Sequence, residues 1–208
     1  MASPENYRPD RRRGRIRENR PVQGDLVPHI ALDDRIPGLP SLLAFRPETA
    51  GPLVALAETL LRGESPLGRG DRELIASYVS ELNGCRFCAG SHGACAAAQL
   101  PGGEDLVQQV HADLDAASVS PKTKALLRIA AAVARGGREV ADAHITAART
   151  EGATDMEIHD TVLIAAAFCM YNRYVDGLGT TLPPDPAIYT EVAKRLTTHG
   201  YKSALTRP

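Results

Sequence analysis

The chain has 208 residues, of which 43% are hydrophobic and 24% charged, and its formal net charge is −1. This length suits a single domain with a sizeable core, and the near-neutral charge argues against a nucleic-acid-binding protein. Aromatic residues make up only 4% and tryptophan is absent, which favours close-packed helices over a β-sandwich.

The N-terminal segment, residues 1–40, is polar and rich in arginine. We expect an irregular arm that is solvated or docks a partner. It lacks the apolar stretch of a signal peptide, and the longest apolar run, 161–171, is too short to cross a bilayer. We therefore expect residues 41–208 to form one cytoplasmic domain that binds neither membranes nor nucleic acid.

Helical patterns dominate the rest of the chain. Ser120 and Pro121 are a typical N-cap and first helical residue, and Thr154 with Glu157 forms a capping-box pattern. No alternation typical of strands is evident, so the predicted fold class is an all-α bundle of about seven helices. The predicted helices span 53–63, 71–84, 85–99, 120–137, 138–152, 154–179 and 187–199.

The helix predicted over 71–84 has a clear apolar stripe. Its members recur at helical spacing and are expected to face the core: Leu74, Ile75, Tyr78, Val79 and Leu82. Glu73 lies opposite this stripe, so the pattern alone predicts a solvated surface glutamate. The small residues Ala76 and Ser80 would allow another helix to pack closely beside it.

Three of the four cysteines lie in GCRFCAGSHGAC, residues 84–95. Gly84 ends one helix, so Cys85 and Cys88 open the next, and His92 lies one turn beyond Cys88 on the same face. A helix N-terminus favours a thiolate, which is the reactive form of cysteine. His92 is placed to accept the thiol proton or to stabilise the thiolate.

Three interpretations of this cluster remain open. A metal site would use Cys85, Cys88, His92 and Cys95, but these positions spread over about 15 Å of helix axis and cannot all converge on one ion. A partial site that another chain completes is the form of this interpretation that stays open. Inert burial is the second interpretation, and it suits Cys95 and Cys169 best. A dithiol–disulfide redox pair of Cys85 and Cys88 is favoured. Unlike the motif of thioredoxin, this CxxC follows a helix rather than a strand.

The segment RELIASYVSELNGCRFCAGSHGA, residues 72–94, resembles the core of the AhpD-like alkylhydroperoxidases of the carboxymuconolactone decarboxylase superfamily. The family pattern Glu-x11-Cys-x2-Cys-x3-His falls in register on Glu73, Cys85, Cys88 and His92. LVALAETLLRG and MYNRYVDGLG resemble the peroxidase-related branch. The resemblance covers roughly residues 40–180.

The resemblance implies a role for each motif residue. Cys88 would be the peroxidatic thiolate, which a hydroperoxide oxidises to a sulfenic acid. Cys85 would donate a proton to the leaving alkoxide, close the disulfide and receive the attack of an external reductant. His92 and Glu73 would form the proton relay that ionises Cys88. The implied partners are a hydroperoxide, a lipoylated or thioredoxin-like dithiol protein, and further copies of the chain as a homo-oligomer.

Some positions depart from the family pattern or stand outside it. Phe87 replaces a histidine that assists the relay in founding members, which predicts weaker activity or a different reductant. Tyr78 is a weak candidate for an additional donor, with packing as its simpler role. Asn172 and Asp176 are expected to bridge helices near the site. We expect no metal and no cofactor, and the remaining histidines are predicted to stand alone on the surface: His29, His111, His144, His159 and His199.

Two other functions remain as alternatives. The first is a lactone decarboxylase like the namesake enzymes of the superfamily, for which a CxxC pair has no evident use. The second is a non-catalytic redox sensor or disulfide reductase, in which Cys85 and Cys88 form a reversible disulfide without turning over peroxide.

Overall fold

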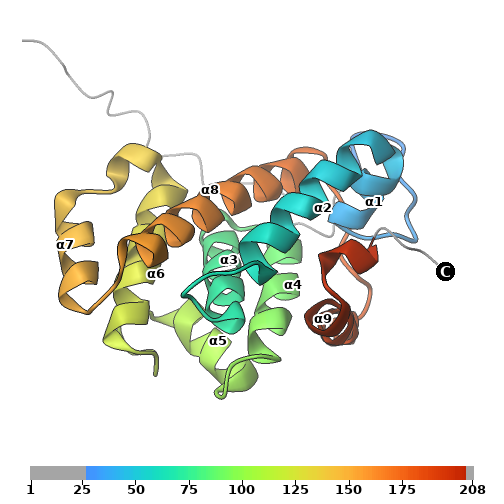
Figure 1. Ribbon diagram of the computed structural model, residues 1–208. Helices are drawn as coiled ribbons and strands as arrows, with labels where there is room; N and C mark the ends of the chain where they lie inside the picture. The colour runs from blue at the N-terminus through green and yellow to red at the C-terminus, as the bar shows by residue number, and fades with distance from the viewer. Residues whose placement is uncertain (1–26, 205–208) are drawn as a thin grey trace, which may run out of the picture.

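The computed structural model describes residues 27–204 (Figure 1). The greater part of the arm predicted for residues 1–40 therefore lies outside the described residues. Residues 27–38 form turns and bends, and helices follow from Leu39 onwards. The helices are α1 (Leu39–Phe45), α2 (Pro47–Arg62), α3 (Arg69–Asn83), α4 (Arg86–Ala97), α5 (Gly103–Ala112), α6 (Pro121–Arg135), η1 (Gly137–Glu139), α7 (Asp142–Thr150), α8 (Asp155–Gly177), α9 (Ala187–His199) and η2 (Tyr201–Ala204).

The all-α fold class is confirmed, since no β-strand occurs between residues 27 and 204. The number of helices was underestimated, because this span holds nine α-helices and two 3₁₀ helices, η1 and η2, rather than about seven helices. The α1 helix has only seven residues, about two turns, which is too short for an apolar stripe to stand out. The α5 helix directly follows Pro101 and Gly102, which indicated a loop, and its first residue is the positive-φ Gly103. Both signals indicated a loop, whereas packing against α4 and α3 stabilises α5 as a helix.

Capping positions predicted from the sequence are confirmed. The Ser120 hydroxyl accepts a hydrogen bond from the backbone N–H of Thr123 at 3.0 Å, and α6 begins at Pro121. At the start of α8, the Glu157 N–H donates to the Thr154 hydroxyl and the Thr154 N–H donates to the Glu157 carboxylate. These local bonds satisfy N–H groups that a helix leaves unpaired at its first turn, so each cap marks a real helix boundary.

The α3 and α4 helices form the centre of the molecule (Figure 1). The long α8 helix packs across α3 and α6, α7 packs on the outer side of α6, and α9 packs against α4. The η2 turn lies between α2 and α9. The main core therefore gathers between α3, α6 and α8, where its largest fully buried side chains include Leu74, Val79, Leu127, Ile129, Ile164 and Phe168.

The central position of α3 changes how its residues are buried. Every residue from 72 to 80 is buried, on all sides of the helix. Four members of the predicted stripe lie in the core, but Leu82 is 50% exposed because it lies near the end of the helix. A helix enclosed on all sides buries polar residues as well as apolar ones, and Glu73 is one of the buried polar residues of α3. No helix within residues 27–204 is long and apolar enough to cross a membrane.

Candidate active site

The tight connection between α3 and α4 positions both cysteines of the CxxC motif. Gly84 adopts the left-handed conformation at φ 76°, which a glycine accepts without strain, and ends α3. The Cys85 N–H then donates to the Ser80 carbonyl at 2.9 Å, and the Cys85 carbonyl accepts from Ala89 at the start of α4. Cys85 is thus the N-cap residue of α4, and Cys88 lies in its first turn.

The two sulfur atoms are neighbours in a buried, apolar setting. All four cysteines of the chain are free thiols. Cys85 has no exposed surface and Cys88 is 3% exposed, and both pack against Val175. A hydrogen bond to Cys88 raises the pKa of the Cys85 thiol far above its ordinary value, and burial raises it further. Cys85 therefore keeps its proton and is the donor of the pair, which leaves the sulfur of Cys88 as the acceptor.

Glu73 and His92 form a short, buried pair. The Nδ1 atom of His92 lies 2.7 Å from Oε2 of Glu73, and the Glu73 side chain is 3% exposed. An ionised carboxylate can only accept hydrogen bonds, so the network assigns the proton to Nδ1 of His92. The other ring nitrogen, Nε2, is then the basic atom. The ring also packs edge-on against Phe168, with 4.5 Å between centroids, which fixes its orientation.

The burial of Glu73 corrects the pattern-based prediction of a surface glutamate. The helical stripe located the face of α3 that meets the main core. It could not show that α4 and η2 would cover the opposite side as well. Burial of an acidic residue is costly unless hydrogen bonds compensate, and Glu73 receives them on both oxygens.

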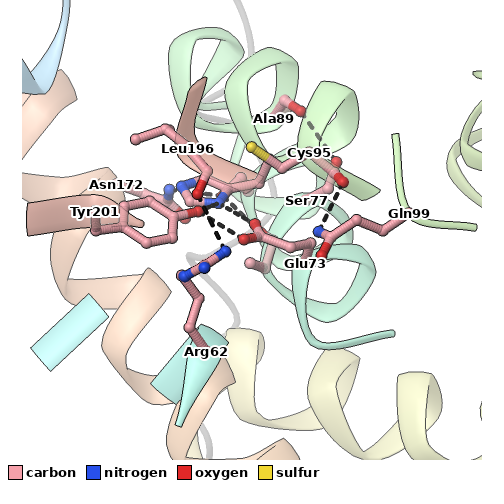
Figure 2. Close-up of polar contacts among 12 residues, drawn as sticks. Arg62, Glu73, Ser77, Ala89, Cys95, Gln99, Asn172, Leu196 and Tyr201 are labelled. Carbon is pink, nitrogen blue, oxygen red and sulfur yellow. Dashed lines mark hydrogen bonds and ion pairs between the residues drawn. The ribbon is translucent and has the colours of Figure 1, made fainter. Parts of the chain in front are cut away.

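Tyr201 is a site residue that sequence reasoning missed. Its hydroxyl donates to Oε1 of Glu73 at 2.7 Å and lies 3.3 Å from Nδ1 of His92 (Figure 2). The ring stacks on the imidazole with 6.0 Å between centroids. Tyr201 follows the cysteine motif by more than a hundred positions and belongs to no recognisable spacing, so the sequence held no signal for it.

Cys88 and His92 line the same cavity, whose volume is about 110 Å³. Its walls come from α1, α2, α4, α8, α9 and η2, and most of them are apolar. Residues that contribute to these walls include Leu39, Leu43, Leu53, Phe87, Phe168 and Val192. Cys85 is not among the lining residues, so a molecule inside the cavity meets the sulfur of Cys88 and not that of Cys85.

Phe87 occupies the position at which the family resemblance places a relay histidine. Its ring lies edge-on to Tyr189 of α9, with centroids 6.1 Å apart, and it fills the space beside Gly38 so closely that a Cβ atom there would collide with it. Phe87 therefore closes the cavity wall instead of moving protons. Tyr78 packs in the main core, away from the cavity lining, and takes the packing role.

Other predicted residues serve the scaffold. The Asn172 amide donates to the Ser80 hydroxyl at 2.9 Å and its oxygen accepts from Asn83 at 2.8 Å, so Asn172 bridges α8 to α3 as expected. Asp176 acts on the site electrostatically, because its charge contributes to the raised pKa of Cys85. Cys169 is half-buried and accepts a weak hydrogen bond from Asn83 at 3.6 Å.

Cys95 lies apart from the CxxC pair. It is 1% exposed and packs with Ala193 and Leu196 of α9, and burial raises the pKa of its thiol. Within residues 27–204, no three histidine, cysteine, aspartate or glutamate side chains are grouped so that they could hold a metal ion. The Tyr201 hydroxyl, which reaches Glu73, also shares a hydrogen bond with Cys95, so Cys95 borders the histidine–glutamate pair rather than the CxxC pair.

Two of the five other histidines are not exposed, contrary to the prediction of lone surface residues. His111 is largely buried, and its Nε2 lies 2.9 Å from the Ser77 hydroxyl, which in turn donates to the Ala89 carbonyl. Burial lowers the pKa of His111, and the charges of Glu81 and Glu104 act in the opposite direction. His144 is half-buried, whereas His29, His159 and His199 are exposed. Since Ser77 already donates its proton to a carbonyl, its pair with His111 is a structural contact between α3 and α5.

Known proteins share part of this sequence and this fold. A family model described as the carboxymuconolactone decarboxylase family matches residues 101–181. A crystal structure described as an alkylhydroperoxidase AhpD core, an uncharacterized peroxidase-related protein from Ralstonia eutropha JMP134, is 27% identical with a TM-score of 0.66, and the match covers 76% of this chain and 82% of that one. Both findings support an assignment to the AhpD-like proteins of the carboxymuconolactone decarboxylase superfamily.

A second structure agrees with this assignment. An uncharacterized peroxidase-related protein from Silicibacter sp. TM1040 is 26% identical with a TM-score of 0.67, and the match covers 85% of this chain and 98% of that one. A search of curated proteins found no match. The family-model match begins after α4, so the motif residues of this AhpD-like protein lie outside it, and their roles depend on the geometry above.

Proposed function

We propose that this AhpD-like protein is a thiol-dependent hydroperoxide reductase. The observation that carries the proposal is the shared cavity of Cys88 and His92, with Glu73 buried behind the histidine and the Cys85 thiol directed at Cys88. This arrangement supplies a nucleophile, a base with an orienting carboxylate, and a second thiol in contact with the first. These are the parts that reduction of a peroxide through a disulfide requires.

The proposed reaction has two chemical steps. His92 takes the proton of Cys88, and the thiolate attacks the terminal oxygen of ROOH; the O–O bond breaks, Cys88 becomes a sulfenic acid, and the alkoxide leaves as ROH with the proton of Cys85. The Cys85 thiolate then attacks the sulfenic sulfur. The S–S bond forms, and the hydroxide that leaves takes the proton from His92 as water. A dithiol reductant finally reduces the disulfide and becomes oxidised itself.

The cavity supports organic hydroperoxides as substrates. A volume of about 110 Å³ lined mainly by apolar side chains admits a compact alkyl or aryl group and removes it from water. Hydrogen peroxide gains nothing from such walls. We therefore propose that compact organic hydroperoxides react faster than hydrogen peroxide.

The burial of Cys85 bears on the reductant. Cys85 has no exposed surface, so the expected attack of a reductant on this sulfur requires the cavity wall to move. Cys88 faces the cavity, and a dithiol on a long flexible arm could reach it there. This supports a lipoylated reductant protein over a thioredoxin-like one, whose own motif sits on a bulky surface.

The direct test is hydroperoxide consumption by the purified protein with a dithiol present. Wild-type protein is expected to reduce cumene or tert-butyl hydroperoxide, and Cys88→Ser is expected to abolish turnover. Cys169→Ser is the matched control, since that thiol is half-buried and lies outside the cavity lining. Full activity in Cys88→Ser would refute the mechanism.

Lactone decarboxylation is the second candidate, and the family-model match is the observation that favours it. That reaction has no evident need for two adjacent thiols. A Cys85→Ser/Cys88→Ser double variant that still decarboxylates a muconolactone would establish this activity. A redox sensor would instead form the disulfide without measurable peroxide turnover, which stopped-flow mixing of reduced protein with peroxide distinguishes.

A further inference from the structure

The carboxylate of Glu73 receives hydrogen bonds from two separate parts of the chain. His92, on α4, approaches Oε2, and Tyr201, on η2, approaches Oε1, each at 2.7 Å. Figure 2 shows the Tyr201 side chain beside Glu73. The histidine belongs to the sequence motif, whereas the tyrosine arrives from the last described turn of the chain. Among the described residues, these two side chains account for the hydrogen bonds that Glu73 accepts.

A built contact with α2 fixes the position of Tyr201. The carboxylate of Glu58 accepts the Tyr201 N–H at 2.6 Å, and Arg62 pairs with Glu58 at 3.4 Å. Arg62 also donates to the carbonyls of Leu196 and Thr197 at the end of α9. Gly200 has φ 80°, and a Cβ atom there would lie 2.8 Å from the Glu58 carboxylate. The turn at Gly200 and Tyr201 therefore packs closely against Glu58 of α2.

In its hydrogen bond with the Glu73 carboxylate, the phenol of Tyr201 is the donor. Burial raises its pKa well above the ordinary value, and the charge of Glu73 adds to the effect, so the hydroxyl keeps its proton. A donor to a carboxylate stabilises the ionised form. At 2% exposure, Glu73 has almost no contact with solvent water that could take the place of this donor. The hydrogen bond from Tyr201 therefore offsets part of the free-energy cost of burying the Glu73 carboxylate.

We propose that Tyr201 is a positioning residue of the relay, which holds the Glu73 carboxylate aimed at Nδ1 of His92. The ionisation of Cys88 then depends on the docking of the C-terminal turn against α2. The inference rests on the proposed function only in taking His92 as the base that serves Cys88. It adds to the motif a residue from a distant part of the chain.

Other charged and titratable groups surround the relay and remain in place when the Tyr201 hydroxyl is removed. They hold the Tyr201 turn, line the shared cavity, or interact with Glu73 or Tyr201: Glu58 and Arg62 on α2, Arg72 on α3, Cys88 and Cys95 on α4, Tyr171 on α8, and Arg195 on α9. A change seen on removing the hydroxyl therefore reports the contacts of that hydroxyl with Glu73, His92 and Cys95.

The test is Tyr201→Phe, with the rate of iodoacetamide alkylation at Cys88 followed against pH in the full chain by peptide mass spectrometry. Loss of one donor to a buried carboxylate is expected to move the midpoint of this profile upward by about one pH unit, a rate about tenfold lower on the acid side. Tyr78→Phe is the matched control, because it removes a buried phenol hydroxyl from α3 itself without touching the relay.

Gly200→Ala provides a second, independent variant. It displaces the turn from Glu58 and leaves every relay side chain unchanged, so it is expected to shift the alkylation profile in the same direction. Profiles that coincide with wild type in both variants, or that move to lower pH, would overturn the inference. Since alkylation needs no peroxide, a wild-type protein that consumes no hydroperoxide but shows the shift would refute the proposed function and leave the role of Tyr201 standing.

Discussion

Replacement of Glu73 by glutamine tests the relay most sharply, because it keeps the shape of the side chain and removes its charge. Two donors converge on Glu73: the hydroxyl of Tyr201 and Nδ1 of His92. A glutamine offers one acceptor oxygen and one NH₂ group, which is itself a donor. If its oxygen accepts from Tyr201, its NH₂ group faces His92 and forces the imidazole to carry its proton on Nε2. The basic atom then points away from Cys88.

The size of the effect follows from the bond that is lost. A hydrogen bond to a charged group in a buried site contributes about 1.5–3 kcal/mol, and 1.36 kcal/mol corresponds to a factor of ten. The carboxylate stabilises the imidazolium that forms when Cys88 ionises. We therefore expect Glu73→Gln to slow the oxidation of Cys88 at pH 7 by about 10- to 150-fold.

The assay is single-turnover oxidation of the reduced protein by cumene hydroperoxide in a stopped-flow instrument. Glu157→Gln is the matched control, since Glu157 is also a buried carboxylate with hydrogen bonds, but it pairs with Lys122 at the start of α8 and lies outside the cavity lining. Its rate should stay within about twofold of wild type, well inside the loss expected for a broken relay. Equal rates for wild type and Glu73→Gln would refute the assignment of a relay.

Three further outcomes are expected. Cys85→Ser should leave Cys88 oxidisable but without a resolving partner, so intact mass spectrometry should show sulfenic and then sulfinic acid; a stable unmodified thiol after peroxide would contradict this. Gly84→Ala should lower the free energy of unfolding by about 1–2 kcal/mol, because φ 76° is costly for alanine, whereas Gly51→Ala, on an open face of α2, should raise it by up to about 1 kcal/mol; urea titration measures both. Burial acts to raise the pKa of Glu157, but the ion pair with Lys122 and the cap hydrogen bonds hold this pKa below its ordinary value. The ionised carboxylate therefore stabilises the folded state above about pH 4.5, and this contribution is lost as the pH falls through the lower pKa of the folded state. Glu157→Gln should therefore lower the melting temperature at pH 7 and flatten its decline between about pH 5 and pH 3, and an unchanged slope would count against the assignment.

Local sequence signals located seven of the nine α-helices and the cysteine motif. The capping residues Ser120 and Thr154 act within a few positions of themselves, and Gly84 adopts its turn because of its own lack of a side chain. Signals of the same short sequence range predicted that Cys85 lies at the N-terminus of α4 and Cys88 in its first turn. These features follow from hydrogen bonds between near neighbours, which a sequence displays directly.

Helix α5 and the early start of α2 show where local signals mislead. Pro52 and Gly51 lie inside α2, which begins six residues before the predicted helix. A proline in an early turn removes one backbone hydrogen bond, and packing against α1 and α3 outweighs that loss. The intrinsic preference of a segment is a small term, so tertiary contacts decide its state when the two disagree.

The sequence by itself determined the all-helical class, the caps, and the register that brings Cys85, Cys88 and His92 onto the start of one helix. Only the tertiary structure decided that Glu73 is buried, that Tyr201 completes its hydrogen bonds, and that helices from both ends of the chain enclose the cavity at Cys88. The physical reason is range. Helical periodicity reports which face of a segment is apolar, whereas the burial of a carboxylate depends on every element that packs around it, and the one that covers Glu73 lies 128 positions further along the chain.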